Sequence, residues 1–170
     1  MKIAILSDIH DHVNNLQKVL EMSEFQATEA MLCCGDLCSP FILKLFGQGY
    51  SRPIHIALGN NDGDVAAFIN VSKDYPNINI NGDYFRGELA GKSFAMNHYP
   101  EKARILAENG GFDVVCYGHN HNLSSNDTIN NTLFINPGTL MGFHGGSLKT
   151  IPATFLILDT ETLETEVFEL

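Results

Sequence analysis

Apolar residues come in short runs along this chain, and polar loops separate them. The first runs are short and rich in branched apolar residues, as buried strands are. Between them, apolar residues recur at helical spacing, Pro40 opens a helix, and Asp64 is placed to cap another. Strands are expected at residues 2–6, 30–34 and 53–58, and helices at 13–23, from 40 to the glycines at 47 and 49, and from 64 to about 72. Three strand–loop–helix units in a row favour a parallel sheet.

The second half of the chain has a different pattern. Short runs separated by Asn81-Gly82 and Ala90-Gly91 predict a hairpin or meander with antiparallel pairing. Strands are expected at residues 77–80, 83–89, 92–97, 112–116, 124–129, 132–135, 153–158 and 165–168, a helix at 101–108, and loops at 136–139 and 142–149. The chain therefore joins a parallel half to an antiparallel half, with no repeat or linker between them.

Polar residues that can bind metal follow each of the first three strands. Asp8 and His10 follow the first, Asp36 the second, and Asn60 the third. Ligands bind outside the carboxyl ends of the strands in open parallel sheets, so these side chains are expected along one edge. Turn formation and helix capping are sufficient roles for Asp62, but they account poorly for Asp8 and His10.

Histidines come at the ends of two later strands. His98 follows residues 92–97, and His119 and His121 follow residues 112–116. Two loop histidines at i and i+2 can both face one point, although a lone His-x-His motif is weak. The predicted ligand set is Asp8, His10, Asp36, Asn60, His98, His119 and His121.

This set of side chains can hold two divalent cations that share a carboxylate and leave positions open for water. Its mixture of nitrogen and oxygen suits Mn, Fe, Zn, Co or Ni better than Ca or Mg, which prefer oxygen ligands. A hydroxide that bridges the two cations would attack phosphorus in line.

Composition limits the classes of function. The 170 residues are 44% hydrophobic and 18% charged, which favours one globular domain over residues 1–170. The net charge of −10 argues against an extended nucleic-acid surface or an anionic-membrane surface, but a small phosphate ester remains possible because bound metals reverse the local sign. No apolar run reaches the ~20 residues of a membrane span. The four cysteines include no C-x-x-C, so we expect reduced thiols and a cytoplasmic location.

The motifs of the chain resemble those of the calcineurin-like metallophosphoesterase superfamily, in the same order. They are Asp8-x-His10, Gly35-Asp36, Gly59-Asn60-x-Asp62, a lone His98 after a strand, and Gly118-His119-x-His121. The small size is similar to that of its compact bacterial and archaeal phosphodiesterase branch, the YfcE-like proteins. The resemblance implies an α/β (α+β) fold over the whole chain, a four-layer αββα sandwich of two mixed β-sheets flanked by helices.

The resemblance also implies how the ligands divide between the metals. One metal would be held by Asp8, His10, Asp36 and His121, and the other by Asp36, Asn60, His98 and His119. Asp36 would bridge two ions, Mn first among the candidates. The sequence leaves open whether His119 and His121 are exchanged.

The chain departs from the family pattern in three places. Cys38 and Ser39 stand where the family often has an acid, Tyr99 where a Gly is usual, and Asn61 where a leaving-group histidine is common. Asn61 is therefore a candidate for contact with the leaving group or phosphate, but its amide limits the chemistry because it does not titrate.

Two further histidines are candidates for the site. His12 could reach the leaving group or phosphate, although an exposed residue at a helix start explains it as well. His144, in a glycine-rich loop, could fold over the cleft and bind substrate. His55 alternates with apolar neighbours and is expected to be structural.

The leading hypothesis is a metal-dependent phosphoesterase that prefers diesters to monoesters. The alternative is a non-catalytic scaffold on the same fold, like the retromer subunit Vps29, and a zinc hydrolase of another ester or amide is a third possibility. The complete ligand set favours an enzyme, because a scaffold does not need it. Cyclic nucleotides, glycerophosphodiesters and nucleotide pyrophosphates all remain open as substrates, and a homo-oligomer is possible.

Overall fold

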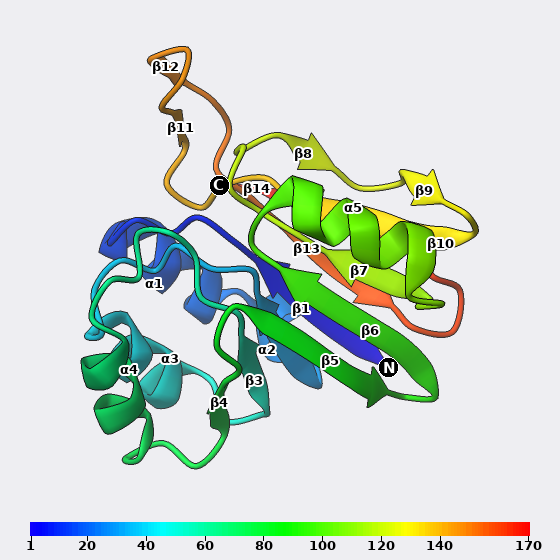
Figure 1. The fold of residues 1–170 in the computed structure, drawn as a ribbon. Helices are drawn as coiled ribbons and strands as arrows, with labels where there is room; N and C mark the ends of the chain where they lie inside the picture. Colours follow the sequence, from blue (N-terminus) through cyan, green and yellow to red (C-terminus); the bar gives the residue numbers. More distant parts are fainter.

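Three parallel strands near the N-terminus form the centre of the first sheet. They are β1 (Lys2–Leu6), β2 (Ala30–Cys33) and β3 (Ile54–Ile56). Leu6 pairs with Cys33, and Cys33 pairs with Ile56, so the three strands end level with one another. The loops that follow them therefore meet at one edge of the sheet. The computed structural model describes all 170 residues, and Figure 1 shows their arrangement.

The helices of the first half pack against one face of this sheet. Leu16, Phe46 and Phe68 are fully buried in one cluster with strand residues Ala4 and Leu6. The helices are α1 (Val13–Glu21), α2 (Ser23–Gln26), α3 (Ile42–Gly49) and α4 (Val65–Ser72). The helix expected over 13–23 is divided at Met22, whose backbone is extended, whereas α3 ends at Gly49, one of the two glycines expected to close it. Asp64 caps α4 as predicted, accepting from Ala67 N at 3.0 Å.

The second sheet has the order β5-β6-β7-β10-β8, and β9 pairs with β10. Helix α5 (Pro100–Asn109) covers its outer face, where Ala103 and Ala107 pack with Phe134. Its strands are β5 (Tyr84–Leu89), β6 (Lys92–Asn97), β7 (Val114–Cys116), β8 (Leu123–Ser124), β9 (Thr128–Ile129) and β10 (Thr132–Pro137). The strand expected at 124–129 is thus two short strands, and β10 includes two residues expected in a loop.

The two sheets pack face to face. Ala4 and Leu6 of β1 point toward the helices, whereas Ile3 and Ile5 belong to a cluster that includes Phe94 of the second sheet. This alternation follows from the two-residue period of a strand. Each sheet has parallel and antiparallel pairs, so the expected αββα sandwich of two mixed sheets is confirmed.

Strand β4 (Ile78–Ile80) is not part of the antiparallel meander that the sequence suggests. It pairs in parallel with β3, with Ile54 opposite Ile78, because Ile78 is buried with the helix-side core. Asn81-Gly82 therefore carries the chain from the first sheet to the second. Only β5 and β6 form the hairpin, turning at Ala90 and Gly91 with φ of 50° and 75°.

The C-terminal part adds a short projecting hairpin and then returns to the first sheet. Residues expected to be loose form β11 (Phe143–His144) and β12 (Lys149–Thr150). Residues 143–150, here called the arm, project from the body in Figure 1. The last hairpin, β13 (Thr154–Asp159) and β14 (Thr165–Glu169), is confirmed and pairs with β1. No helix has the length and apolar character needed to cross a membrane.

Candidate metal centre

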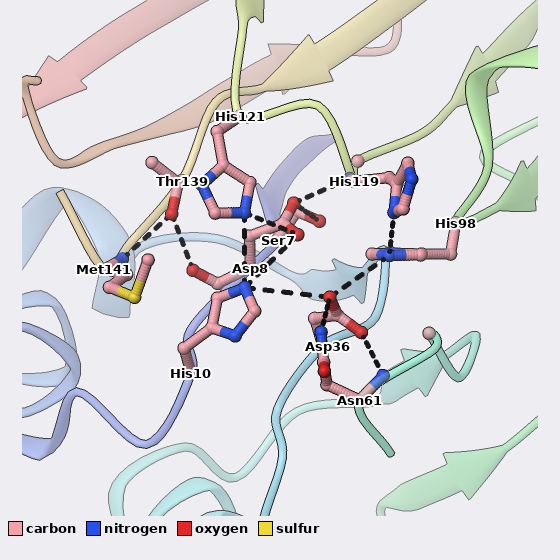
Figure 2. Close-up of polar contacts among 12 residues, drawn as sticks. Ser7, Asp8, His10, Asp36, Asn61, His98, His119, His121, Thr139 and Met141 are labelled. Atoms are coloured by element: carbon pink, nitrogen blue, oxygen red, sulfur yellow. Dashed lines mark hydrogen bonds and ion pairs between the residues drawn. The ribbon is translucent and has the colours of Figure 1, made fainter. Parts of the chain in front are cut away.

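The seven predicted ligands lie together where the strands of both sheets end. Figure 2 labels all of them except Asn60. They form two groups with potential ligand atoms close together. In the first, Nε2 of His121 lies 3.3 Å from Oδ1 of Asp8 and 3.2 Å from Nε2 of His10. Nε2 of His10 lies 3.8 Å from the same Asp8 oxygen. One cation between these atoms could be held by all three side chains.

The second group contains Asp36, Asn60, His98 and His119. Oδ1 of Asn60 lies 3.1 Å from Nε2 of His98 and 2.9 Å from Nδ1 of His119, and the two ring nitrogens are 3.3 Å apart. Oδ2 of Asp36 lies 3.3 Å from Nε2 of His98 and 3.7 Å from Nε2 of His10. This one carboxylate oxygen therefore faces both groups.

Backbone carbonyls fix the ring orientation of two histidines. Nδ1 of His98 lies 2.7 Å from the carbonyl oxygen of Cys34, and Nδ1 of His121 lies 2.6 Å from that of Phe143. A carbonyl can only accept, so each Nδ1 carries the hydrogen and each neutral ring presents the lone pair of Nε2 to the centre. This is the usual arrangement around metal-binding histidines.

Asp8 supplies the clearest sign that a cation fits here. Its Oδ2 accepts from Ser7 Oγ at 2.6 Å and from His119 N at 2.9 Å, whereas its buried Oδ1 has no hydrogen-bond partner. Such an oxygen is costly to bury without a partner. Because Oδ1 faces the Nε2 atoms of His10 and His121, a cation shared with these two side chains would satisfy it.

The carboxylates of the centre are held in their charged forms. Burial raises the pKa of Asp8, but contacts with His10 and His121 outweigh burial and hold the pKa well below its usual range. Burial also opposes ionisation of Asp36, yet His98 and Asn61 lower its pKa overall. The same contacts raise the pKa of His98 and His121, although burial acts in the opposite direction. The centre thus keeps negative charge available for cations.

The backbone at the centre is unusually strained. Five of the seven predicted ligands have φ in the left-handed region, which residues other than glycine rarely adopt. They are Asp8 (54°), His10 (45°), Asp36 (55°), His119 (72°) and His121 (58°). Strain of this kind clusters at functional sites and costs on the order of 1–3 kcal/mol per residue. Sequence reasoning placed these residues on loops but gave no indication of this strain.

Asp62 connects the loops without reaching the centre. Its Oδ2 accepts from Asp36 N at 2.9 Å and from Gly59 N at 2.8 Å, and its Oδ1 accepts from Cys38 N at 2.8 Å. Burial raises its pKa despite these bonds. The turn-forming role expected for Asp62 thus extends to the loop that carries Asp36, which its place in the sequence does not reveal.

The candidates outside the ligand set have different surroundings. Asn61 contacts Asp36, with Nδ2 donating to Oδ2 at 2.8 Å (Figure 2). Nδ1 of His12 caps α1 by accepting from Asn15 N at 3.3 Å, and His12 is not among the residues that line the cleft. His144 does line the cleft, with its ring centroid 6.3 Å from that of His121.

A cleft of about 450 Å³ opens over the two groups. Its walls include ligands from both groups, the side chains of Asn61 and Met141, and the arm residues His144, Gly145 and Gly146. The volume suits a small molecule. A phosphate ester could therefore reach both candidate metal positions at once.

Several solved structures share this fold at low sequence identity. Vps29 of Chaetomium thermophilum has a TM-score of 0.69 and 14% identity, with 100% of this chain and 94% of that chain covered. YfcE of E. coli, a phosphoesterase, has a TM-score of 0.66 and 20% identity, covering 94% of this chain and 89% of that chain. These likenesses establish the fold alone.

Closer matches identify the family. Residues 1–163 match the calcineurin-like phosphoesterase superfamily domain. The phosphodiesterase MJ0936 of Methanocaldococcus jannaschii is 35% identical over 166 residues, 96% of each chain. A solved archaeal phosphodiesterase has a TM-score of 0.88 and 34% identity, with both chains fully covered. The chain belongs to the calcineurin-like phosphoesterase superfamily.

Proposed function

We propose that this protein is a phosphodiesterase that works with two divalent cations. The observation that carries the proposal is the position of Asp36, whose Oδ2 faces His98 of one ligand group and His10 of the other. A carboxylate oxygen between two such groups can hold two ions side by side. Two ions held in this way supply an activated water and stabilise charge on the phosphoryl oxygens.

The proposed ligands divide as the geometry groups them. The first ion would be held by Asp8, His10, His121 and Asp36, and the second by Asp36, Asn60, His98 and His119. His121 is assigned to the first ion because its Nε2 lies beside Asp8, and His119 to the second because its Nδ1 lies beside Asn60. Mixed nitrogen and oxygen ligands support Mn²⁺ as the first choice, with Fe, Zn, Ni or Co as alternatives.

We assign His144 to the substrate. Ser147 N donates to Nδ1 of His144 at 3.0 Å, so the neutral ring carries its hydrogen on Nε2. A ring in this state, beside the cleft, can donate to a phosphate oxygen. Asn61 has the separate role of holding Asp36 in place through its amide. The helix cap formed by His12 gives that residue a structural role in place of contact with the leaving group.

The scaffold alternative accounts less well for these features. A protein-interaction module would gain nothing from an unpartnered oxygen on buried Asp8 or from left-handed backbone at five ligand positions. Both features raise the free energy of the metal-free fold. They are consistent with selection for cation binding and catalysis.

The proposal includes the surroundings in which the enzyme works. Residues 1–170 act as one phosphoesterase domain in the cytoplasm. Cys33, Cys34 and Cys116 are buried free thiols, and burial raises the pKa of Cys38 to about 12. Thiols in these states react slowly and suit a reducing compartment. The substrate is a small phosphate ester, and no nucleic-acid or membrane partner is needed.

A screen of phosphate esters tests the proposal. The purified protein, its metal content determined by elemental analysis, is assayed with and without added Mn²⁺ against matched monoesters and diesters. Turnover should require metal and should favour diesters, and Asp36→Ala should abolish it. Wild-type protein that binds two ions and hydrolyses no ester in the panel would favour the scaffold.

A further inference from the structure

A second cavity adjoins the metal cleft and differs from it in chemistry. It has a volume of about 290 Å³ and is lined by Leu123, Ile151 and Val167, among others. His121 and Asn122 line both this cavity and the metal cleft. The two cavities therefore meet at a proposed metal ligand. We call the second cavity the apolar groove.

The walls of the apolar groove are fixed by strand pairing. Leu123 belongs to β8, two residues after His121, and pairs with Pro137 of β10. Thr154, which also lines the groove, donates from Oγ1 to the carbonyl oxygen of Pro137 at 2.6 Å. Val167 lies on β14, the strand that pairs with β13. The segment that places the second histidine of the His-x-His motif thus also places the groove beside it.

The groove leaves large apolar side chains open to solvent. Leu123 is 44% exposed and Val167 is 41% exposed, although most apolar residues of these sheets are buried. A hydrocarbon group in the groove would remove part of this surface from water, which favours binding by roughly 25 cal/mol per Å². The groove can therefore contribute affinity that the polar metal cleft cannot.

The charges around both cavities disfavour an anionic substituent. No lysine or arginine lines either cavity, and the acidic Glu169 lines the apolar groove. The chain has a net charge of −10. The candidate metals could neutralise one phosphoryl group, but a second phosphate or a carboxylate on the same substrate would find no cationic side chain.

We infer that the substrate is a phosphate ester with an uncharged, apolar substituent, either alkyl or aryl. This substituent lies in the apolar groove while the phosphoryl group of the substrate lies at the metal centre. The inference rests on the proposed function and narrows its substrate class. It disfavours nucleotide pyrophosphates, whose second phosphate would find no lysine or arginine in either cavity. It favours diesters, whose single negative charge falls on the phosphoryl group at the metals.

Phosphonates whose substituents differ in chemistry test the groove without requiring turnover. Their binding to the Mn²⁺-loaded protein is measured by calorimetry, using methyl-, butyl- and phenylphosphonate and the carboxylate-bearing 3-phosphonopropanoate. Butylphosphonate should bind roughly 10- to 50-fold more tightly than methylphosphonate, because each buried methylene contributes up to about 4-fold. The carboxylate-bearing compound should lose this gain.

Two groove variants locate the effect, and a third is the control. Leu123→Asp and Val167→Asp should each reduce the butyl-over-methyl gain to less than about 3-fold and leave the affinity for methylphosphonate nearly unchanged. Leu148→Asp alters an apolar residue that is 76% exposed on the arm and lines neither cavity, so it should keep the full gain. If one groove variant does not fold, the other still tests the groove.

Two outcomes separate the groove from the proposed hydrolysis. Equal affinities across the phosphonates, or a chain-length gain that both groove variants retain, would overturn the groove even if diesters are hydrolysed. A gain that depends on Leu123 and Val167, in a protein that hydrolyses no diester, would support the groove and count against the proposed function.

Discussion

The side chain of Asn61 donates from Nδ2 to Oδ2 of Asp36 at 2.8 Å, and its backbone N–H donates to Oδ1 of the same carboxylate at 2.8 Å. Oδ2 is the oxygen that faces both ligand groups. A carboxylate with both oxygens hydrogen-bonded has its plane and rotamer fixed before any cation arrives. Asn61 is therefore a positioning residue for the proposed bridging ligand.

Asn61→Ala should weaken metal binding because it removes the bond from Nδ2 and keeps the one from the backbone. Loss of a partner that orients a metal ligand typically reduces affinity about 10- to 100-fold. Calorimetric titration of the metal-free protein with Mn²⁺ measures the change. Asn109→Ala is the control, since it removes a similar amide bond, to the carbonyl of Ile105, on an exposed helix end. Equal Mn²⁺ affinities for wild type and Asn61→Ala would count against the positioning role.

Asp36→Ala should remove both ions, whereas His121→Ala should remove mainly one. Only Asp36 faces both groups, and His121 contacts only the Asp8 group. Elemental analysis of proteins purified in parallel gives the ratio of metal to protein. His12→Ala should keep the wild-type ratio, since His12 does not line the cleft. Two tightly bound ions in Asp36→Ala would show that the carboxylate does not bridge.

The positions of the proposed ligands could be predicted because each follows a short apolar run. Leu6, Cys33 and Ile56 pair in register, so a polar residue just after any of these strands must lie at the same edge. The type and order of the residues then indicated metal chemistry. Both inferences depend on local pattern, which a sequence displays directly.

Contacts between distant segments could not be predicted in this way. Nothing in residues 77–80 shows that Ile78 pairs with Ile54 of the first sheet, because a short apolar run fits either sheet. The carbonyls of Cys34 and Phe143, which orient His98 and His121, are backbone atoms and carry no residue signature. The contact of Asn61 with Asp36 joins two loops and likewise depends on the folded chain.

The rate of the wild-type enzyme should depend steeply on the leaving group. Asn61 stands where the family commonly has a histidine, and an amide does not titrate, so it cannot protonate a departing alkoxide. General-acid assistance is typically worth about 10²- to 10⁴-fold. Diesters with leaving groups of graded pKa should therefore give a steep slope, with aryl esters fastest.

The same series with Asn61→His tests the origin of that slope. The imidazole should raise activity most on esters with poor leaving groups, although loss of the amide bond to Asp36 should weaken metal binding. The comparison is therefore made at saturating Mn²⁺. A shallow slope in wild type that the substitution does not change would show that another acid is present.

Stability should fall on acidification partly because of His55. Its ring packs on Phe85 with centroids 4.7 Å apart, its buried Nδ1 has no hydrogen-bond partner, and burial lowers its pKa from the ordinary value of 6.5. The unfolded chain thus takes up this proton at higher pH than the folded chain. The contribution of His55 to the free energy of unfolding is fully present above pH 6.5. It is lost as the pH falls toward the pKa of His55 in the folded protein.

Urea denaturation of wild type and His55→Gln at several pH values measures this contribution. The variant should lose less stability than wild type between about pH 7 and pH 5. His98 and His121 have raised pKa values and act in the opposite direction, but both are present in the two proteins and cancel in the difference. Parallel curves for the two proteins would contradict the assignment to His55.

Gly59 and Gly63 lie in one loop after β3, and alanine should destabilise the protein at Gly59 but not at Gly63. A Cβ on Gly59 would lie 2.7 Å from Asp36 N and closer still to Oδ1 of that residue, whereas a Cβ on Gly63 would meet nothing within 4 Å. Neither glycine has a positive φ, so space alone distinguishes them.

Gly59→Ala must push back the loop that carries Asp36. Asp62 ties this loop to Gly59, because it accepts hydrogen bonds from the backbone N–H groups of both Asp36 and Gly59. Overpacking of this kind costs on the order of 1–3 kcal/mol of unfolding free energy, and a displaced Asp36 should also bind metal more weakly. Gly63→Ala should stay within about 0.5 kcal/mol of wild type and keep both ions. Urea denaturation and Mn²⁺ titration of the two variants decide the matter, and wild-type Mn²⁺ affinity in Gly59→Ala would mean that the close approach of these two loops does not set the position of Asp36.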